Sequence, residues 1–238
     1  MNIVITMGGL GARFKKAGYN IPKYEIEAKG KTLFTWSMLS LKSFWDNSFI
    51  FIVRREDKAK AFIQKECRAL GIRAIIVEID KLTRGQAETT MLAENVWDKK
   101  APLLIYNIDT YVKPGCMSPR IFRGDGFIPC FHAEGTHWSF VRLDEEGKAI
   151  EVREKIRISD NCSIGAYYFS TADLYREVYQ KFYEEEEHLE SGERYIAPMY
   201  NYMIQHGKIV YIQDIPSDCV HVLGTPVEVE EFLSLGHI

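Results

Sequence analysis

The sequence predicts an α/β protein with a doubly wound, mostly parallel mixed sheet. In the first half of the chain, short apolar runs rich in β-branched residues alternate with stretches of helical spacing, which is the pattern of successive βαβ units. These runs do not alternate cleanly between apolar and polar residues, as is typical of strands covered on both faces. In the second half the strands alternate more clearly, and we expect them to form a small mixed extension of the sheet.

Four buried strands and three helices are predicted in the first half. The strands are Asn2–Thr6, Phe49–Val53, Ala74–Ile79 and Leu103–Ile108. Between them, helical spacing predicts helices over Leu33–Phe44, Asp57–Leu70 and Gln86–Trp97.

The second half is predicted to add strands first and helices later. Strands are expected over Phe127–His132, Trp138–Leu143, Ile150–Lys155 and Ser163–Phe169, with a hairpin turn at 144–148. Helices from about Thr171 to Glu186 and from about Arg194 to Gln205 follow, and then a strand at Lys208–Ile212. A last helix is expected to begin with Thr225 as its cap, Pro226 in the first position and Glu228 completing a capping box.

Composition points to one domain and excludes several classes of protein. The 238 residues are 46% hydrophobic and contain neither a Pro/Gly/Ser-rich linker nor a fixed-period repeat, so a single domain over residues 1–238 is expected. A net charge of −3 lacks the positive excess of a nucleic-acid-binding protein. The first apolar run, of only about five residues, is too short for a signal peptide or a membrane span, so we expect a cytoplasmic protein without a membrane partner. The five cysteines form no CxxC pair, which argues against a disulfide framework or a zinc site.

A glycine-rich segment with two nearby cations follows the first predicted strand. It runs Gly8-Gly9-Leu10-Gly11-Ala12-Arg13-Phe14, and Pro22-Lys23 comes shortly afterwards. Glycines let backbone N–H groups approach a phosphate closely, so anion binding is the natural use of such a turn. A dinucleotide-binding loop would need a third glycine where Phe14 stands, and no P-loop pattern is present.

In these residues the sequence resembles the sugar-phosphate nucleotidyltransferases, also called nucleoside-diphosphate-sugar pyrophosphorylases. Their motif is a strand, then G-x-G-x-R-[LF], a short variable stretch and P-K, and the resemblance extends over most of the chain. It implies a Rossmann-like, GT-A-like fold of the short form without a C-terminal β-helix. Residues 1–125 would form a nucleotide-binding half and 126–238 an acceptor-binding half.

The resemblance also implies roles for individual residues on the nucleotide side. Arg13 and Lys23 would be catalytic, with Arg13 stabilising the departing pyrophosphate and Lys23 the α-phosphate. The loop residues Gly8, Gly9, Leu10 and Gly11 would bind the nucleotide. The stretch 83–89 resembles the loop that reads the base, which makes Gly85 and Gln86 candidates for base contacts; a helix that simply begins after a glycine is the structural alternative.

A carboxylate at the end of a predicted strand is the candidate metal ligand. Asp109 follows Leu103–Ile108, and ligands of open α/β sheets bind beyond the carboxyl ends of the strands, where Mg²⁺ would be held by carboxylates, phosphates and water. In the resembling family this aspartate is the first metal ligand. A second aspartate, in a D-x-G-T-like stretch, is missing here, although Gly224-Thr225-Pro226 is present. His221 is the candidate replacement and Asp218 a further one, and a single carboxylate ligand remains an alternative.

The acceptor would bind to the second half of the chain. Glu154 and Lys155 resemble a glutamate–lysine pair that contacts the sugar and the phosphate of the acceptor, although an exposed pair on a strand is the simpler interpretation. Gly165 would leave room for the acceptor. Arg194 would pair with phosphate or cap its helix.

These features together predict a Mg²⁺-dependent nucleotidyltransferase. Its substrates would be a nucleoside triphosphate, CTP or dTTP by resemblance, and a sugar phosphate or another small phosphorylated acceptor, for the synthesis of surface polysaccharide precursors. A GT-A-type glycosyltransferase that uses a nucleotide sugar is the alternative, because Asn107-Ile108-Asp109 partly fits its metal motif. A catalytically silent binding module is a third hypothesis, and whether the chain forms a homodimer is left open.

Overall fold

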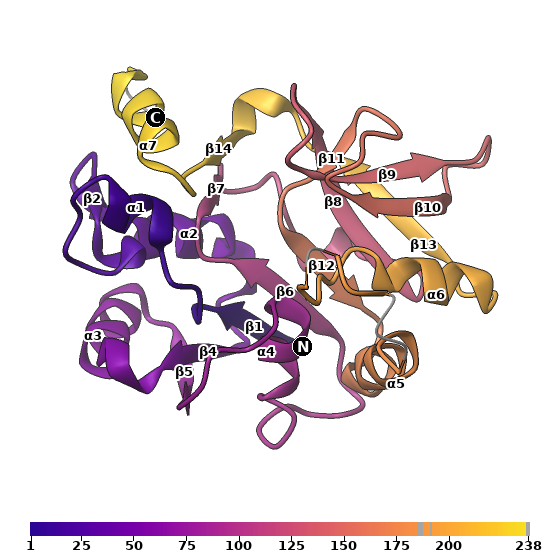
Figure 1. Cartoon of the computed structure of the whole chain (residues 1–238), viewed down its shortest axis with the longest axis horizontal. Coiled ribbons are helices and arrows are strands. Elements are labelled where there is room, and N and C mark those ends of the chain that lie inside the picture. The colour runs from indigo at the N-terminus through magenta and orange to yellow at the C-terminus, as the bar shows by residue number, and fades with distance from the viewer. Residues whose placement is uncertain (185–187, 191, 237–238) are drawn as a thin grey trace.

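The structure, a computed structural model, describes residues 1–184, 188–190 and 192–236, and within them its centre is one sheet of ten strands (Figure 1). From one edge to the other the strands are β10 (Ala149–Glu154), β9 (Ser139–Leu143), β11 (Asn161–Ser163), β8 (Gly126–His132), β12 (Ala166–Phe169), β6 (Leu103–Asn107), β1 (Asn2–Thr6), β4 (Ser48–Arg54) and β5 (Arg73–Ile79), with β13 (Val210–Asp214) beside β8. Strands β6, β1, β4 and β5 are parallel to one another, and from β12 onward the pairing is mostly antiparallel. The predicted mixed sheet with a parallel core is confirmed.

Helices cover both faces of the parallel part. The side chains of β1 alternate between them: Ile3 packs in one core cluster with Phe34 of α2 (Leu33–Ser40), and Val4 packs in another with Tyr175 of α5 (Ala172–Phe182). The helix α3 (Lys60–Leu70) joins the first cluster, while α4 (Gln86–Met91) and α6 (Met199–Gln205) join the second. Each fully buried apolar side chain contributes roughly 1.5–3 kcal/mol, so these two clusters hold the layers together.

The expected strands of the first half agree with the structure to within one residue at each end. Ser163–Phe169, expected as one strand, is two strands, β11 and β12. The break falls at Gly165, whose φ of 80° is in the left-handed region and interrupts the extended chain.

Several helices are shorter than predicted. The α3 helix begins at Lys60 rather than Asp57, because Lys58 has a φ of 50° and ends a 3₁₀ turn over Arg55–Asp57. The helix expected from Arg194 begins at Met199, with Pro198 at its cap position, since a proline fits the start of a helix and not its interior. The expected end of the 171–186 helix, residues 185 and 186, lies outside the described residues.

A small ladder outside the main sheet brings the C-terminal segment to the edge of the parallel strands. Its two strands, β7 (Thr110–Val112) and β14 (Val220–Val222), were not predicted. The helix α7 (Pro226–Ser234) follows, and it lies beside α1 (Ala12–Lys16) and the short hairpin of β2 (Glu27–Ala28) and β3 (Lys31–Thr32) (Figure 1). The ring of Phe232 in α7 also packs against the ring of Trp36 in α2, with 5.2 Å between centroids.

The start of α7 differs from the predicted capping box. The Thr225 hydroxyl accepts a hydrogen bond from the Glu228 N–H at 3.2 Å, as expected. Within the described part of the chain the Thr225 N–H makes no return bond to the Glu228 side chain, and the Glu228 Oε2 has no hydrogen-bond partner. As for membrane association, none of the helices in the described ranges has the length and apolar character needed to cross a bilayer.

Candidate active site

A cleft of about 760 Å³ opens beyond the carboxyl ends of β1 and β6. One wall is the loop after β1, the floor is formed by residues that follow β6, and the other wall comes from the antiparallel extension. The predicted site residues that line it are Gly8, Gly9, Leu10, Gly11, Arg13, Lys23, Gly85, Gln86, Asp109, Glu154 and Gly165. Lys155, Arg194 and His221 do not line it.

The glycine loop offers bare backbone to the cleft. Gly11 has a φ of 59° and caps α1, a conformation that favours glycine. A Cβ added to Gly9 would meet no atom within 4 Å, so the space in front of this residue is open. The N–H groups of Gly9, Leu10 and Gly11 donate to no acceptor in the described ranges. They are therefore free to bind an anion.

The two predicted residues Lys23 and Asp109 contact each other although 86 positions separate them. The Lys23 Nζ donates to the Asp109 Oδ2 at 2.6 Å, and both side chains keep about a fifth of their surface exposed. Lys23 begins a 3₁₀ turn immediately after Pro22, and Asp109 follows β6, so the topology of the sheet edge joins them. A cation and a carboxylate thus lie together next to the glycine loop.

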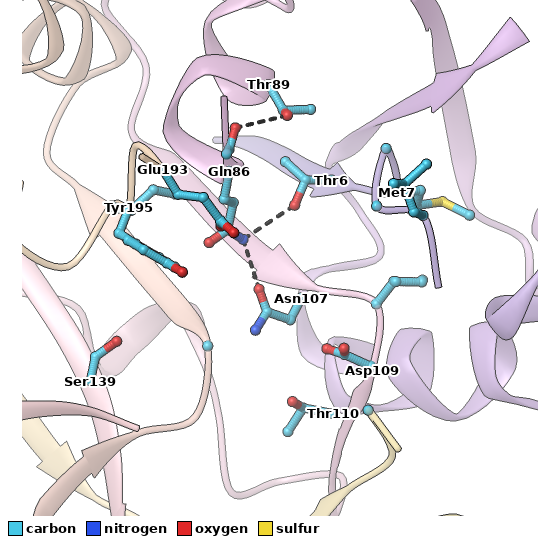
Figure 2. A pocket seen from close by; sticks show the side chains of 18 of the residues that line it. Thr6, Met7, Gln86, Thr89, Asn107, Asp109, Thr110, Ser139, Glu193 and Tyr195 are labelled. Carbon is cyan, nitrogen blue, oxygen red and sulfur yellow. Dashed lines mark hydrogen bonds between the residues drawn. The ribbon is translucent and has the colours of Figure 1, made fainter. Parts of the chain in front are cut away.

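Gln86 is held between the ends of the two central strands. Its side-chain amide donates to Asn107 Oδ1 at 2.7 Å and to Thr6 Oγ1 at 3.2 Å. Figure 2 shows Gln86 and Asn107 between Asp109 on one side and Glu193 and Tyr195 on the other. These bonds fix the middle of the cleft.

The surroundings of Gly85 leave no room for a side chain at this position. Its φ is 125°, and an added Cβ would lie 2.6 Å from the carbonyl oxygen of Arg194. The Arg194 backbone clasps this loop, because its N–H donates to Arg84 O and its carbonyl accepts from Ala87 N. The guanidinium bonds the Tyr179 hydroxyl instead of entering the cleft.

Gly165 also makes room for a residue of the protein itself. An added Cβ would collide with the side-chain amide of Asn107, so the space left by this glycine is filled by that side chain. The sequence alone suggested that the acceptor would use this space. Gly165 nevertheless lines the cleft with its backbone.

Glu154 lies buried at the far end of the cleft in a hydrogen-bonded group. Its Oε2 accepts from the Ser139 hydroxyl at 2.5 Å, and that hydroxyl is 3.0 Å from the Tyr167 hydroxyl. Burial raises the pKa of Glu154, and the bond from Ser139 opposes this shift. The next residue, Lys155, has a φ of 56° and donates to the Tyr195 hydroxyl at 2.5 Å. Lys155 therefore reaches the cleft only through Tyr195.

The two candidates for a second metal ligand do not line the cleft that contains Asp109. His221 stacks on Tyr111, with 5.6 Å between ring centroids, and burial followed by the charge of Lys113 lowers its pKa. Its neighbour Val222 lines the cleft instead, because successive side chains of β14 point to opposite faces. Asp218 is exposed beside Lys113. Across the described residues, no group of three or more His, Cys, Asp or Glu side chains is arranged to hold a metal.

Some residues of the cleft wall were not predicted from the sequence. Glu193 and Tyr195 line it, although Arg194 was chosen from the same stretch. Ser139 and Tyr167 complete the group around Glu154. Glu228, expected only to cap a helix, also lines the cleft. Alternation of side chains along the backbone could have indicated Glu193 and Tyr195. Because Arg194 points away from the cleft, the residues on either side of it point toward the cleft.

Comparisons with known proteins identify the class. No protein-family model and no curated protein matches the chain. The solved structure of a nucleoside-diphosphate-sugar pyrophosphorylase from Vibrio cholerae RC9 matches with a TM-score of 0.91 at 36% identity, over 98% of this chain and 100% of that one. The inositol-1-phosphate CTP transferase from T. maritima matches with a TM-score of 0.77 at 17% identity, over 98% of this chain and 94% of that one, a likeness of fold alone.

The fold is that of the nucleotidyltransferases. The identity to the Vibrio protein, over nearly the full length of both chains, shows the family: this chain belongs to the nucleoside-diphosphate-sugar pyrophosphorylases. The resemblance inferred from the glycine loop is confirmed, and the protein is a nucleotidyltransferase rather than a glycosyltransferase.

Proposed function

We propose that this enzyme is a Mg²⁺-dependent nucleotidyltransferase that couples CTP or dTTP to a sugar phosphate or another small phosphorylated acceptor and releases pyrophosphate. The observation that carries the proposal is the convergence of the bare loop, Arg13, Lys23 and Asp109 on one cleft. A triphosphate is strongly anionic, and bonds between charged partners are about twice as strong as neutral ones. By its resemblance to the family, we place its product among the precursors of surface polysaccharides.

The proposed reaction is an in-line displacement at the α-phosphorus. A phosphate oxygen of the acceptor forms the new bond to this atom, the bond to the bridging oxygen breaks, and pyrophosphate leaves with the electron pair. The attacking phosphate is already ionised near neutral pH, so no general base is needed. Catalysis then consists of positioning and neutralisation of charge.

The residues in and near the glycine loop would share the positioning of the triphosphate and the neutralisation of its charge. The free N–H groups of Gly9, Leu10 and Gly11 would bind phosphate oxygens of the triphosphate. Arg13, exposed at the rim, would neutralise the departing pyrophosphate, and Lys23 the charge on the α-phosphate. Loss of one such cation typically lowers the rate by on the order of 10²-fold or more.

Asp109 would hold the Mg²⁺. Its carboxylate is partly exposed in the cleft, and Mg²⁺ is commonly bound by one or two carboxylates together with phosphate oxygens and water, so this donor fits the ion. When bound, the ion would neutralise charge on the phosphates. His221 is not carried into this proposal, because its ring packs against Tyr111.

The acceptor would bind beside Glu154 and Gly165, in the half of the chain after residue 125. Both residues line the cleft, and a carboxylate bonded to a hydroxyl is suited to meet the hydroxyls of a small polar molecule. Lys155 would act by fixing the Tyr195 ring that lines the cleft, and Arg194 by clasping the Gly85 loop. These two are proposed as positioning residues.

The test is a screen for pyrophosphate release. CTP, dTTP, UTP, ATP and GTP would each be offered with Mg²⁺ and a panel of sugar 1-phosphates, alditol phosphates and other phosphomonoesters. We expect turnover that needs both substrates and is strongest with CTP or dTTP. If no pair releases pyrophosphate, the proposed pair of substrates is overturned.

A further inference from the structure

The cleft contains a further carboxylate at the start of α7. Glu228, in the first turn of α7, lines the cleft. Its Oε2 is buried and has no hydrogen-bond partner in the described part of the protein. A buried polar atom without a partner costs about 1–3 kcal/mol, and more when it carries charge. A ligand that binds to this Oε2 atom would remove that cost.

Glu228 and Asp109 face the same small space. A Cβ placed on Gly224 would lie 3.1 Å from Asp109 Oδ2 and 3.5 Å from Glu228 Oε2. Both oxygens are therefore within 3.5 Å of a single point beside the Gly224 backbone. Asp109 Oδ2 is already paired with Lys23 Nζ at 2.6 Å, whereas Glu228 Oε2 has no partner in the described residues, so the two carboxylates together have room for a further cation beside them.

The glycine at 224 is explained by this space rather than by its backbone. Its φ is outside the left-handed region, so the conformation suits other residues. A methyl group at position 224 would occupy the space that the two carboxylates border. The local backbone is also well fixed, because Leu223 N donates to Asp109 O at 2.8 Å and Thr225 caps the helix.

We propose that Glu228 supplies the second carboxylate of the Mg²⁺–nucleotide site, together with Asp109. It takes over the task of the aspartate that the D-x-G-T-like stretch lacks, where Val222 now lines the cleft. The unformed return bond of the capping box has the same explanation, since the side chain turns to the cleft instead of to its own helix. This inference rests on the proposed function.

The experiment measures metal binding directly. Mn²⁺, which can be followed by its EPR signal, would be titrated alone and with CTP or dTTP into the wild type, Glu228→Gln, Asp109→Asn and Gly224→Ala. Glu230→Gln is the matched control, because it removes the same charge from an exposed position of the same helix. Thermal melting checks that each variant is folded.

We expect Glu228→Gln to weaken Mn²⁺ binding by about tenfold or more, the size of effect typical of groups around a metal. Gly224→Ala is expected to do the same without changing the charge, and Glu230→Gln to bind as the wild type does. Unchanged Mn²⁺ affinity in folded Glu228→Gln, with loss of binding in Asp109→Asn, would overturn the role of Glu228 and leave the proposed function standing. If the wild type binds no Mn²⁺ with either nucleotide, both proposals fail.

Discussion

The wall of the cleft that follows β1 is bare backbone, whereas the wall formed by the antiparallel extension is made of side chains that already bond to one another. Around Gly9 and Gly11 the space is open and the N–H groups are free. On the other wall, Glu154 bonds Ser139, Lys155 bonds Tyr195, and Asn107 fills the space beside Gly165.

This difference separates two ways of binding. Under the proposed function, the bare wall would accept phosphate, the part common to all nucleotides, without rearrangement. The bonded wall can accept a ligand only by exchanging existing hydrogen bonds for equivalent ones, and a site of this kind rejects molecules that leave its polar groups unpaired. We therefore expect the bonded wall to set the choice of acceptor.

The largest effect is expected at the cation that joins the bare wall to the floor. Lys23→Ala should lower pyrophosphate release by on the order of 10²-fold or more, because the charge on the α-phosphate loses its partner. The fold should persist, since the side chain is partly exposed. Lys16→Ala, an exposed lysine of α1, is the control and should retain full activity. Equal turnover in both variants would remove Lys23 from the mechanism.

Gly85→Ala should mainly damage stability. The added methyl meets the Arg194 carbonyl at 2.6 Å in a conformation that side chains rarely adopt, which costs roughly 1–3 kcal/mol. For a chain of this size that amounts to a fall in Tm of several degrees, at about 2–4 °C per kcal/mol. An unchanged Tm would mean that the clasp by Arg194 does not hold this loop in solution.

Gly9→Ala should have the opposite profile. The methyl meets no protein atom within 4 Å, so the Tm should stay unchanged, while the closest approach of phosphate to the backbone is obstructed. We expect the KM for the nucleoside triphosphate to rise by roughly tenfold, equivalent to about 1.4 kcal/mol. A fall in Tm with an unchanged KM would contradict the description of this wall as open.

The smallest effect concerns the pH dependence of stability at the bonded wall. Burial raises the pKa of Glu154, so the folded state holds this proton more tightly than the unfolded state does. The wild type therefore loses stability as the pH rises from the ordinary glutamate pKa through the raised value. Glu154→Gln cannot ionise, and its Tm relative to the wild type should increase between pH 4 and pH 8, as followed by thermal melting at about six pH values.

Glu151 on the same strand provides a control of opposite sign. The hydrogen bond from Arg153, and then the charge of Arg142, lower the pKa of Glu151, so its ionised form stabilises the fold above the ordinary glutamate pKa. Glu151→Gln should thus lose Tm relative to the wild type as the pH rises. If both variants shift in the same direction, burial does not govern Glu154.

The parallel core could be predicted well from the sequence because each of its strands is marked by a local run of apolar residues. Apolar runs mark β1, β4, β5 and β6, and the order of a βαβ chain then places Asp109 and the glycine loop at one edge. The ladder of β7 and β14 was missed because each strand has three residues and the partners are about 110 positions apart, so no local pattern marks the pairing.

The direction in which a side chain points was the second feature that the sequence could not predict. Whether His221 or Val222 faces the cleft depends on the pairing of β14 with β7, which residue type does not reveal. The reasons for Gly85 and Gly165 depend on Arg194 and Asn107, far away in the sequence. The sequence pattern identified both glycines as part of the site, but it could not identify the distant residues that contact them in space.

The ladder of β7 and β14 has a consequence for how the cleft forms when the chain folds. Val222, Gly224 and Glu228, which come near the end of the chain, line the same cleft as the loop that follows the first strand. Because segments that are far apart in the sequence line one cleft, the cleft is complete only after the long-range pairing of β14 with β7 has formed.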